Sequence, residues 1–404
     1  MITNKHFDFV IVGAGIIGIS LSIQLKKIFK DSSVCILEKE SRHGFHASGR
    51  NSGVLHAGFY YTENSIKARF CKEGNIALTE YCLEKNIPIN RCGKVVVCQN
   101  EEDHFGMEVL FKRAKNNGVK LEYLSEKDLI EIEPYAKTIE KALFSPNTSS
   151  ASCKDVIDSL YQDATALGVK FFFSESFISL KDIKKIETNK SFIEFGYLIN
   201  CAGVYADKVA RFFGCSNSFS IIPFKGIYLK SKKPHRKIKR HIYPVPNMAH
   251  PFLGTHFTSS IDGYLKIGPT AIPALWLEQY EFFKNFKLSE FLKVARKELA
   301  LFFKSPFNFK KLAYNEYSKL IKSNMINEAN KLTNINFEKN DFIWASPGIR
   351  AQLINNKTHN LEMDFIIETS ENSMHILNAV SPAWTCALSF TKHISERILK
   401  ELST

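Results

Sequence analysis

Three glycines and one carboxylate near the start of the chain have the spacing of a dinucleotide-binding site. Gly13, Gly15 and Gly18 follow the apolar residues 9–12, and Glu38 stands 20 residues after Gly18. The first glycine permits a tight turn, the second lets backbone approach a pyrophosphate, and the third lets a helix pack closely on a strand. Glu38 can accept the ribose hydroxyls, and the first helical turn offers N–H groups to phosphate. The predicted contacts include the neighbours Ile16, Ile17 and Lys39. A chance glycine-rich turn is the alternative.

Residues 46–61 indicate which dinucleotide is bound. They are small, hydroxyl-bearing and glycine-rich, and they end in aromatic residues. A flavin needs loops that wrap its ribityl chain and ring without steric conflict, so this composition favours FAD over NAD. The predicted contacts are Ser48, Arg50, Asn51, Ser52 and Gly53. An ordinary surface turn is the competing interpretation.

The elements that must position these residues alternate between strand and helix patterns. A strand, an amphipathic helix and a second strand fill residues 8–38, as a parallel βαβ unit requires. Helical spacing recurs at 65–86, 102–117, 153–167 and 205–213, and strands are predicted at 93–98, 119–124 and 169–173. The apolar run 195–203 ends in Ala202 and Gly203, which predicts that the chain returns there to the dinucleotide domain. Further β character falls at 219–230, 252–258, 264–268, 341–347 and 374–380, and a closing helix is predicted at 381–399.

A chain of 404 residues exceeds one ordinary core, so two domains are expected. The return at 195–203 means that they are interleaved. We predict a cofactor domain from residues 1–90, 145–218 and 340–404, and a substrate domain from 91–144 and 219–339 with a Lys-rich helical insert at 278–332.

The net charge of +13 is concentrated at 225–241 and 284–322. A solvated lysine-rich surface is the plainest interpretation, and attraction to anionic lipid headgroups is the second. Nucleic acid is not expected as a partner, because no nucleic-acid-binding motif accompanies the charge.

The cysteines and the hydropathy pattern bear on the compartment. Nine cysteines without a Cys-x-x-Cys pair favour reduced thiols over disulfides or zinc, and no metal site is predicted. No segment reaches the roughly 20 apolar residues that span a bilayer, and the first strand begins too early for a signal peptide. We therefore expect a cytoplasmic protein, with peripheral attachment to the inner face of the cytoplasmic membrane as an extension.

Several segments together resemble a known family. The glycine fingerprint, Ser48-Gly-Arg-Asn-Ser-Gly-Val-Leu-His-Ala-Gly58 and Asn200-Cys-Ala-Gly203 are similar to the D-amino-acid-oxidase-like FAD superfamily. Lys67-Ala-Arg-Phe-Cys71, Pro223-Phe-Lys-Gly226, Tyr243-Pro-Val-Pro246, Leu253-Gly-Thr-His-Phe-Thr258, Gly268-Pro-Thr-Ala271, Gly348-Ile-Arg-Ala-Gln352 and Asn378-Ala-Val-Ser-Pro-Ala383 narrow the match. In that order they resemble the L-2-hydroxyglutarate dehydrogenase/oxidase family over almost the whole chain.

The resemblance implies an α/β (α+β) fold, in which a Rossmann-like FAD domain of glutathione-reductase type is interleaved with an antiparallel-sheet substrate domain. It implies oxidation of an L-2-hydroxy acid, most of all L-2-hydroxyglutarate, by hydride transfer to flavin N5, with electrons passed to a quinone or O2. An amine or amino-acid oxidase of the same superfamily is the first alternative. A flavin-containing RNA-modification or scaffold protein is an alternative of another class.

Such a reaction needs an anchor for the substrate carboxylate and a base for the hydroxyl proton. We predict Arg350 as the anchor, because the guanidinium pairs bidentately with a carboxylate and related sequences carry an Arg after a Gly-apolar pair near the C-terminus. His56 and His256 compete as the base, and His375 is a third candidate. Each of these residues could instead be structural.

Other residues are predicted at the edges of the site. Lys225, Tyr243 and Thr255 are tentative pocket residues, and Lys225 could bind the distal carboxylate of a diacid. Gly348 is predicted beside the cofactor. Ser381, Pro382 and Ala383 begin the closing helix, whose positive N-terminus could face the reduced flavin ring.

Overall fold

The structure is a computed structural model that describes residues 3–246 and 252–403. Its contacts divide the chain into two compact units. The first unit contains residues 1–51, 153–222 and 350–404, and the second contains residues 52–152 and 223–349. The chain passes between them inside β13 (Phe219–Gly226) and β20 (Gly348–Asn355), as well as at residues 51–52 and 152–153.

The first unit is built on an eight-stranded sheet with a parallel centre. β1 (Thr3–Val12) lies between β2 (Val34–Glu38) and β12 (Ser191–Asn200) and is parallel to both. The other strands are β9 (Lys170–Phe173), β10 (Phe177–Asp182), β11 (Lys185–Thr188), β21 (Ile367–Ser370) and β22 (Ser373–Ile376). The predicted βαβ unit and the return of the chain beside it are both present.

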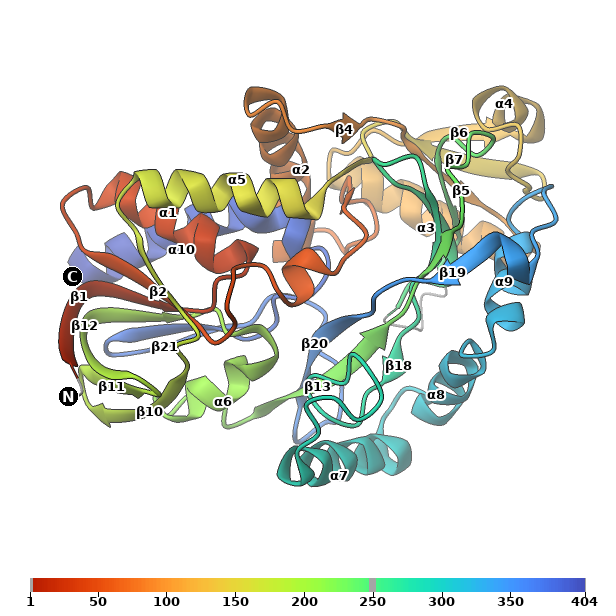
Figure 1. The fold of residues 1–404 in the computed structure, drawn as a ribbon. Helices are drawn as coiled ribbons and strands as arrows, with labels where there is room; N and C mark the ends of the chain where they lie inside the picture. The colour runs from red at the N-terminus through yellow and green to blue at the C-terminus, as the bar shows by residue number, and fades with distance from the viewer. Residues whose placement is uncertain (1–2, 247–251, 404) are drawn as a thin grey trace. The chain divides into compact units, whose positions relative to one another are not determined.

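Helices cover this sheet because each presents an apolar face to it. On one face, α1 (Ile16–Ile28) packs against α5 (Cys153–Ala166) and α10 (Ala383–Ser403) (Figure 1). On the other, Val209 of α6 (Ala206–Arg211) joins a buried cluster with Val10, Val12 and Leu198 of the strands. The core therefore fixes the end of β1, where the glycine turn begins.

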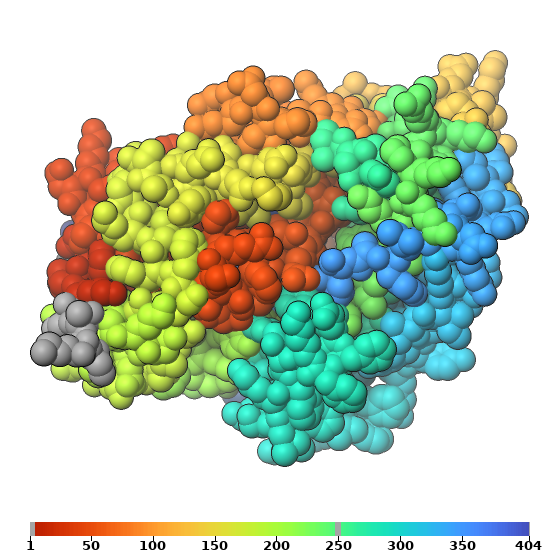
Figure 2. Space-filling model, in the orientation of Figure 1, coloured from red at the N-terminus to blue at the C-terminus, as the bar shows by residue number. Residues whose placement is uncertain are grey.

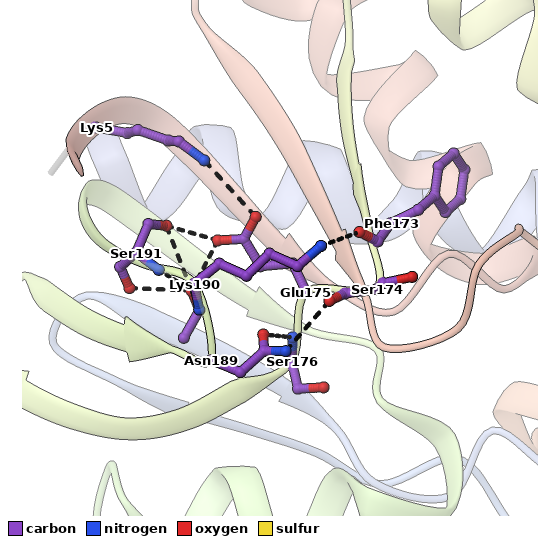
Figure 3. A network of polar contacts seen from close by, with 9 residues as sticks. Lys5, Phe173, Ser174, Glu175, Ser176, Asn189, Lys190 and Ser191 are labelled. Atoms are coloured by element: carbon purple, nitrogen blue, oxygen red, sulfur yellow. Dashed lines mark hydrogen bonds and ion pairs between the residues drawn. The ribbon is translucent and has the colours of Figure 1, made fainter. Parts of the chain in front are cut away.

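A buried carboxylate ties the outer strands of this unit together (Figure 3). Glu175, between β9 and β10, accepts hydrogen bonds from the hydroxyls of Thr188 at 2.7 Å and Ser191 at 2.5 Å. It also pairs with Lys5 of β1 at 3.6 Å. The network joins the β11–β12 turn to the central strand, and it satisfies a charge that would otherwise be costly to bury.

The second unit is built on another eight-stranded sheet, which is antiparallel except for the pair β5 and β15. Its order is β19 (Phe342–Trp344), β14 (Leu229–Ser231), β17 (Leu265–Gly268), β16 (His256–Ser259), β15 (His241–Pro244), β5 (Lys94–Val97), β7 (Lys141–Ser145) and β6 (Glu122–Ser125). On one face, Val95, Ile242 and Phe257 pack with α4 (Glu126–Ile132) and α9 (Lys322–Asn330). On the opposite face, Val96 packs with α3 (Asp103–Asn116).

The contacts group residues 52–90 and 145–152 with the second unit, whereas the sequence led us to expect them in the cofactor domain. The reason is a small sheet of β3 (Val54–Leu55), β8 (Ser149–Ala151) and β4 (Ile89–Asn90), on which α2 (Ile66–Glu84) packs. Short strands such as these carry little sequence pattern, so the division was not visible before the pairing was known.

The Lys-rich insert is divided rather than continuous. After an irregular stretch that begins beyond β18 (Ile272–Pro273), it forms α7 (Leu288–Lys304) and α8 (Phe309–Ser318), which are followed by α9. Pro306 explains the break between α7 and α8, because the residue before a proline avoids helical backbone. No helix in residues 3–246 and 252–403 is long and apolar enough to cross a membrane.

Candidate functional site

The glycine turn of the first unit has the geometry that its sequence predicts. Gly13 has φ of +110°, and a Cβ there would lie 2.5 Å from the carbonyl oxygen of Cys201. A Cβ on Gly18 would lie 2.1 Å from the carbonyl oxygen of Gly13. Both positions therefore require glycine for the fold itself. Gly15 is different, because its φ of −82° is open to other residues.

The N-terminus of α1 is open to an anion. Gly15 caps the helix without a side chain, and the first turn carries no acidic residue. One of its amides, Ile16 N–H, donates to the hydroxyl of Ser48 at 3.0 Å. The helix dipole and the remaining first-turn donors suit a phosphate at this end.

Glu38 lies at the end of β2 beside this turn. One carboxylate oxygen accepts from Ala14 N–H and the other from Glu40 N–H, each at 2.9 Å. Burial raises the pKa of Glu38, and the two amide donors oppose that rise. Each oxygen keeps a lone pair, so the carboxylate can still accept from ribose hydroxyls. Lys39 pairs with Glu40 and lies over the ring of Tyr205 at 5.6 Å.

The segment predicted to wrap the flavin is divided between the units. Ser48, Arg50 and Asn51 belong to the first unit, whereas Ser52 and Gly53 belong to the second. In the first unit, Arg50 donates to the carbonyl of Phe45 at 2.9 Å, and Asn51 donates to the carbonyl of Ser48 at 2.8 Å. In the second, Gly53 has φ of +77°, and its carbonyl accepts from Ala151 N–H at 2.9 Å.

The loop after β12 lies against the glycine turn. Cys201 N–H donates to the carbonyl of Val12, and Ala202 N–H donates to the side chain of Asn200. Gly203 has φ of +56° and open space where a Cβ would point. Such a loop can bring backbone close to a cofactor, as predicted for Ala202 and Gly203.

The closing helix α10 begins at Ala383, immediately after Ser381 and Pro382. Ser381 is exposed, and the next three residues are buried. In its first turn, the indole N–H of Trp384 is buried with no hydrogen-bond partner among the residues that the structure describes. An unsatisfied donor at this helix start fits an acceptor atom of a bound cofactor. Taken together, the residues of the first unit fit FAD.

His375 is a structural residue of the first sheet. It is fully buried in β22, with Nδ1 3.2 Å from the amide nitrogen of Asn200 and Nε2 2.9 Å from the hydroxyl of Ser373. Burial lowers its pKa to about 4. Both ring nitrogens are occupied, so we assign His375 no chemical role. Arg350, at the start of the first unit's part of β20, is half-buried.

The second unit contains the other candidate base. His256 of β16 is buried, and it stacks on Tyr243 of β15 with 3.7 Å between ring centroids. Its Nδ1 lies 2.8 Å from the carbonyl of Gly254, so Nδ1 carries the proton and Nε2 carries a lone pair. Burial lowers its pKa to about 3, which keeps the ring neutral. A neutral imidazole with a lone pair at Nε2 can accept a proton from a hydroxyl.

The remaining predicted residues of the second unit have different environments. Thr255 donates to Glu328 of α9 at 2.6 Å, on the face of the sheet that α9 covers. His56 follows β3, and its backbone carbonyl accepts from Asn75 at 3.2 Å. Lys225 is half-buried, and desolvation lowers its pKa. Gly348 is the first residue of β20.

One residue that sequence reasoning missed lies on the same sheet face as His256. Lys94 begins β5, and its amine is buried with no hydrogen-bond partner among the described residues. The available signal was a single lysine in the apolar run 93–98. An inward charge on a strand is unusual, but lysines at strand ends are common, so the signal was weak.

Comparison with known proteins places this arrangement in a family. The DAO family of FAD dependent oxidoreductases matches residues 8–397. The chain therefore belongs to this family and is an FAD-dependent oxidoreductase. Within it, the chain is 34% identical to an L-2-hydroxyglutarate dehydrogenase of Salmonella houtenae and 33% identical to that of Escherichia coli K12, each over 97% of this chain and 93% of the relative. It belongs with these dehydrogenases, as the sequence motifs predicted.

Solved structures share the fold at low identity. An FAD-bound L-α-glycerophosphate oxidase from Mycoplasma pneumoniae has a TM-score of 0.75 at 19% identity, covering 98% of this chain and 95% of that one. A glycine oxidase from Geobacillus kaustophilus has a TM-score of 0.72 at 15% identity, with the same coverage. They confirm the predicted fold class.

Proposed function

We propose that this chain oxidises L-2-hydroxyglutarate to 2-oxoglutarate. The observation that carries the proposal is its similarity to L-2-hydroxyglutarate dehydrogenases along nearly the whole of both chains. Bound FAD supplies the hydride acceptor for such a reaction. The neutral imidazole of His256 is consistent with the other half of the chemistry, the removal of the hydroxyl proton.

In the proposed reaction, Arg350 binds the carboxylate next to the reacting carbon. His256 Nε2 accepts the hydroxyl proton while the Cα–H bond breaks, and the carbon–oxygen bond becomes a carbonyl. The negative charge of the substrate would raise the pKa of His256 above its low value in the free protein. His56 is the alternative base.

The direct test is an anaerobic titration of the purified yellow protein. We expect L-2-hydroxyglutarate to bleach the flavin absorbance, whereas glycine, sarcosine and D-amino acids leave it oxidised. Bleaching by an amine alone would replace this function with that of an amine or amino-acid oxidase. A separate turnover assay with L-2-hydroxyglutarate would identify the electron acceptor, by consumption of O2 or by reduction of a soluble quinone.

Replacing Arg350 with Ala should raise KM at least about a hundredfold, because the two charged hydrogen bonds of a bidentate pair contribute about 1.5–3 kcal/mol each. The flavin content, read from the ratio of flavin absorbance to protein absorbance, should not change. Arg69→Ala is the control, since that side chain is exposed and pairs with Glu73 on the surface of α2. A KM equal to that of the control would remove Arg350 from the site.

We further propose that the protein is cytoplasmic and attaches to the inner face of the membrane through α7. Nine free thiols favour the reducing compartment. Helix α7 lies at the surface of its unit, and it belongs to the teal atoms in Figure 2. Leu288, Leu292, Leu299 and Phe303 recur at helical spacing along one stripe and are 60%, 57%, 58% and 71% exposed. This stripe, which we call the α7 stripe, does not face the core of the unit.

The charge beside the α7 stripe supports an anionic membrane surface as its partner. At about 100° per residue, Arg296 falls beside the stripe, and Lys293, Lys304 and Lys297 fall between the stripe and the buried side. Val294 and Leu301 fall on the buried side, together with Glu290. An exposed apolar stripe with a basic flank suits an anionic bilayer, which takes the leucines below its headgroups and the cations among them. Attachment there would bring the protein to the membrane, where a quinone acceptor would be available.

Changing both Leu292 and Leu299 to Glu should lower binding to phosphatidylglycerol vesicles at least about tenfold, since each buried leucine contributes about 1.5–3 kcal/mol. Co-sedimentation at low and high salt measures the effect. Phe105→Glu, on α3 and 73% exposed, is the matched control and should bind as the wild type does. Equal binding to phosphatidylcholine, or no loss in the double variant, would refute this attachment.

A further inference from the structure

The amine of Lys94 lies among aromatic rings, and no salt bridge to it is found within residues 3–246 and 252–403. It lies 4.4 Å from the ring centroid of Tyr243, 4.5 Å from that of Tyr60 and 4.9 Å from that of Phe59. The lysine is fully buried, and its amine has no hydrogen-bond partner among the described residues. Cation–π contacts compensate only part of the cost of burying an ammonium group.

Strand register places Lys94 in the same cluster as the proposed base. Lys94 pairs with His241 and Val96 pairs with Tyr243 across the parallel strands β5 and β15. Ile242 pairs with Phe257 on the face that packs against α4 and α9, so Tyr243 and His256 project together from the opposite face. Lys94 projects from that opposite face too, because its neighbour Val95 packs against α4 and α9.

Another buried lysine of the same unit shows what a structural role requires. Lys319 pairs with Glu316 at 2.6 Å and with Glu328 at 3.5 Å. Among the described residues, the acidic groups that act on the amine of Lys94 are the thiols of Cys71 and Cys92. Burial raises the pKa of Cys92 to about 11, so that thiol is neutral. The hydroxyl of Tyr60 is also buried without a hydrogen-bond partner among the described residues. Two neighbouring donors therefore lack an acceptor.

We propose that Lys94 and the hydroxyl of Tyr60 bind the distal carboxylate of the substrate. A carboxylate offers two oxygens to these two donors and supplies the anion that the buried amine lacks. The inference rests on the proposed function, in which the substrate is a five-carbon diacid. Lysine suits the task because its four-carbon stem lets the amine move to a ligand that enters beside the rings.

The site makes a specificity test possible. In Lys94→Met, which keeps the length and apolar stem, kcat/KM for L-2-hydroxyglutarate should fall about tenfold to a hundredfold, as expected for a lost charged hydrogen bond. For L-2-hydroxybutyrate, which has no distal carboxylate, it should not change. Lys120→Met is the matched control, because Lys120 is exposed and pairs with Glu122 at the surface. An equal fall for both substrates would overturn the assignment.

A binding measurement separates this inference from the proposed reaction. Glutarate has both carboxylates but no hydroxyl, so it should raise the Tm of the wild-type holoenzyme even if no 2-hydroxy acid is oxidised. Lys94→Met should lose that rise, and retention of the full rise would refute the site. If Lys94→Met fails to fold, Tyr60→Phe removes one donor without changing the packing. Tyr60→Phe should lower the affinity for glutarate several-fold, and an unchanged affinity would count against the site.

Stability against pH reports whether the amine is charged when no ligand is bound. Burial lowers the pKa of Lys94 from 10.5 to about 7. Below pH 7 the amine is protonated in both folded and unfolded chains, so the full cost of burial is present and Lys94→Met should be the more stable protein. Between about pH 7 and 10.5 the unfolded wild-type chain binds one more proton than the folded chain. The free energy of unfolding of the wild type therefore rises with pH, and its difference from that of Lys94→Met shrinks.

The titratable groups that face the amine are Tyr60, Cys71, Cys92, His241, Tyr243 and His256. A difference that keeps growing below pH 7 would mean that the amine is neutral in the folded protein and cannot act as the cation, whereas a difference that does not depend on pH would mean that burial leaves the pKa of Lys94 unchanged.

Discussion

Replacing His256 with Asn is expected to lower kcat by about a hundredfold to ten-thousandfold, the range for loss of a general base. Asn can still donate to the carbonyl of Gly254, as Nδ1 does at 2.8 Å, but it has no acceptor at the position of Nε2. The ring packing on Tyr243 is lost as well, so the measurement must separate chemistry from folding. Single-turnover reduction of the bound flavin does so, because only the folded holoenzyme contributes.

The chain offers a matched control for this variant. His241 is also a buried histidine on the same sheet face, but its Nδ1 accepts from Ser259 N–H at 3.2 Å and its Nε2 lies 3.4 Å from the sulfur of Cys92. Asn at 241 can replace the acceptor at Nδ1, so we expect a lower Tm with little change in the rate of flavin reduction. If the two variants reduce flavin equally fast, the base lies elsewhere, and His56→Asn is the next test.

The pH profile adds an independent criterion. Burial lowers the pKa of His256 to about 3, so the free enzyme carries a neutral imidazole throughout pH 5–8. A fall of kcat/KM toward acid pH with a midpoint near 6.5 would indicate a solvent-exposed histidine, because that is its unperturbed value. We expect no such midpoint from His256.

Sequence spacing predicted the FAD cofactor and the fold around the glycine turn, because both depend on local patterns. The glycine turn, α1 and Glu38 lie within one βαβ unit, and two glycines meet requirements of the turn itself: Gly13 has φ of +110°, and a Cβ on Gly18 would meet the carbonyl of Gly13. The return of the chain at Asn200 was visible for a similar reason, since an apolar strand that ends in small residues is a local pattern. Contacts across the sheet were not needed for either.

The substrate end could not be predicted in the same way, because strand register decides which side chains share a face. Thr255 and His256 are neighbours, so a strand can direct only one of them to the site, and the sequence does not say which. The structure directs Thr255 to Glu328 and His256 to Tyr243. Lys94 belongs with His256 only through the pairing of β5 with β15, strands separated by more than 140 residues.

Replacing Gly15 with Val is expected to abolish FAD binding while the apoprotein still folds. The backbone at Gly15 has φ of −82° and ψ of 176°, which valine adopts without strain, whereas φ of +110° at Gly13 excludes it. A Cβ on Gly15 would lie 3.0 Å from the hydroxyl of Ser48, so the side chain would push Ser48 away from the Ile16 amide and fill the space in front of α1. A pyrophosphate that loses two charged hydrogen bonds of about 1.5–3 kcal/mol each would bind at least about a hundredfold more weakly.

The measurement is titration of the apoprotein with FAD, followed by quenching of flavin fluorescence, with circular dichroism to establish folding. Gly168→Ala is the control, because that glycine has φ of +83° and open space for a methyl group, so it should lose stability but keep FAD affinity. Gly18 cannot serve as the test, since its Cβ would collide with the carbonyl of Gly13 and disrupt the turn itself. Gly15 is therefore the fingerprint position at which cofactor binding can be separated from folding. Normal FAD affinity in Gly15→Val would show that the phosphates do not approach α1 there.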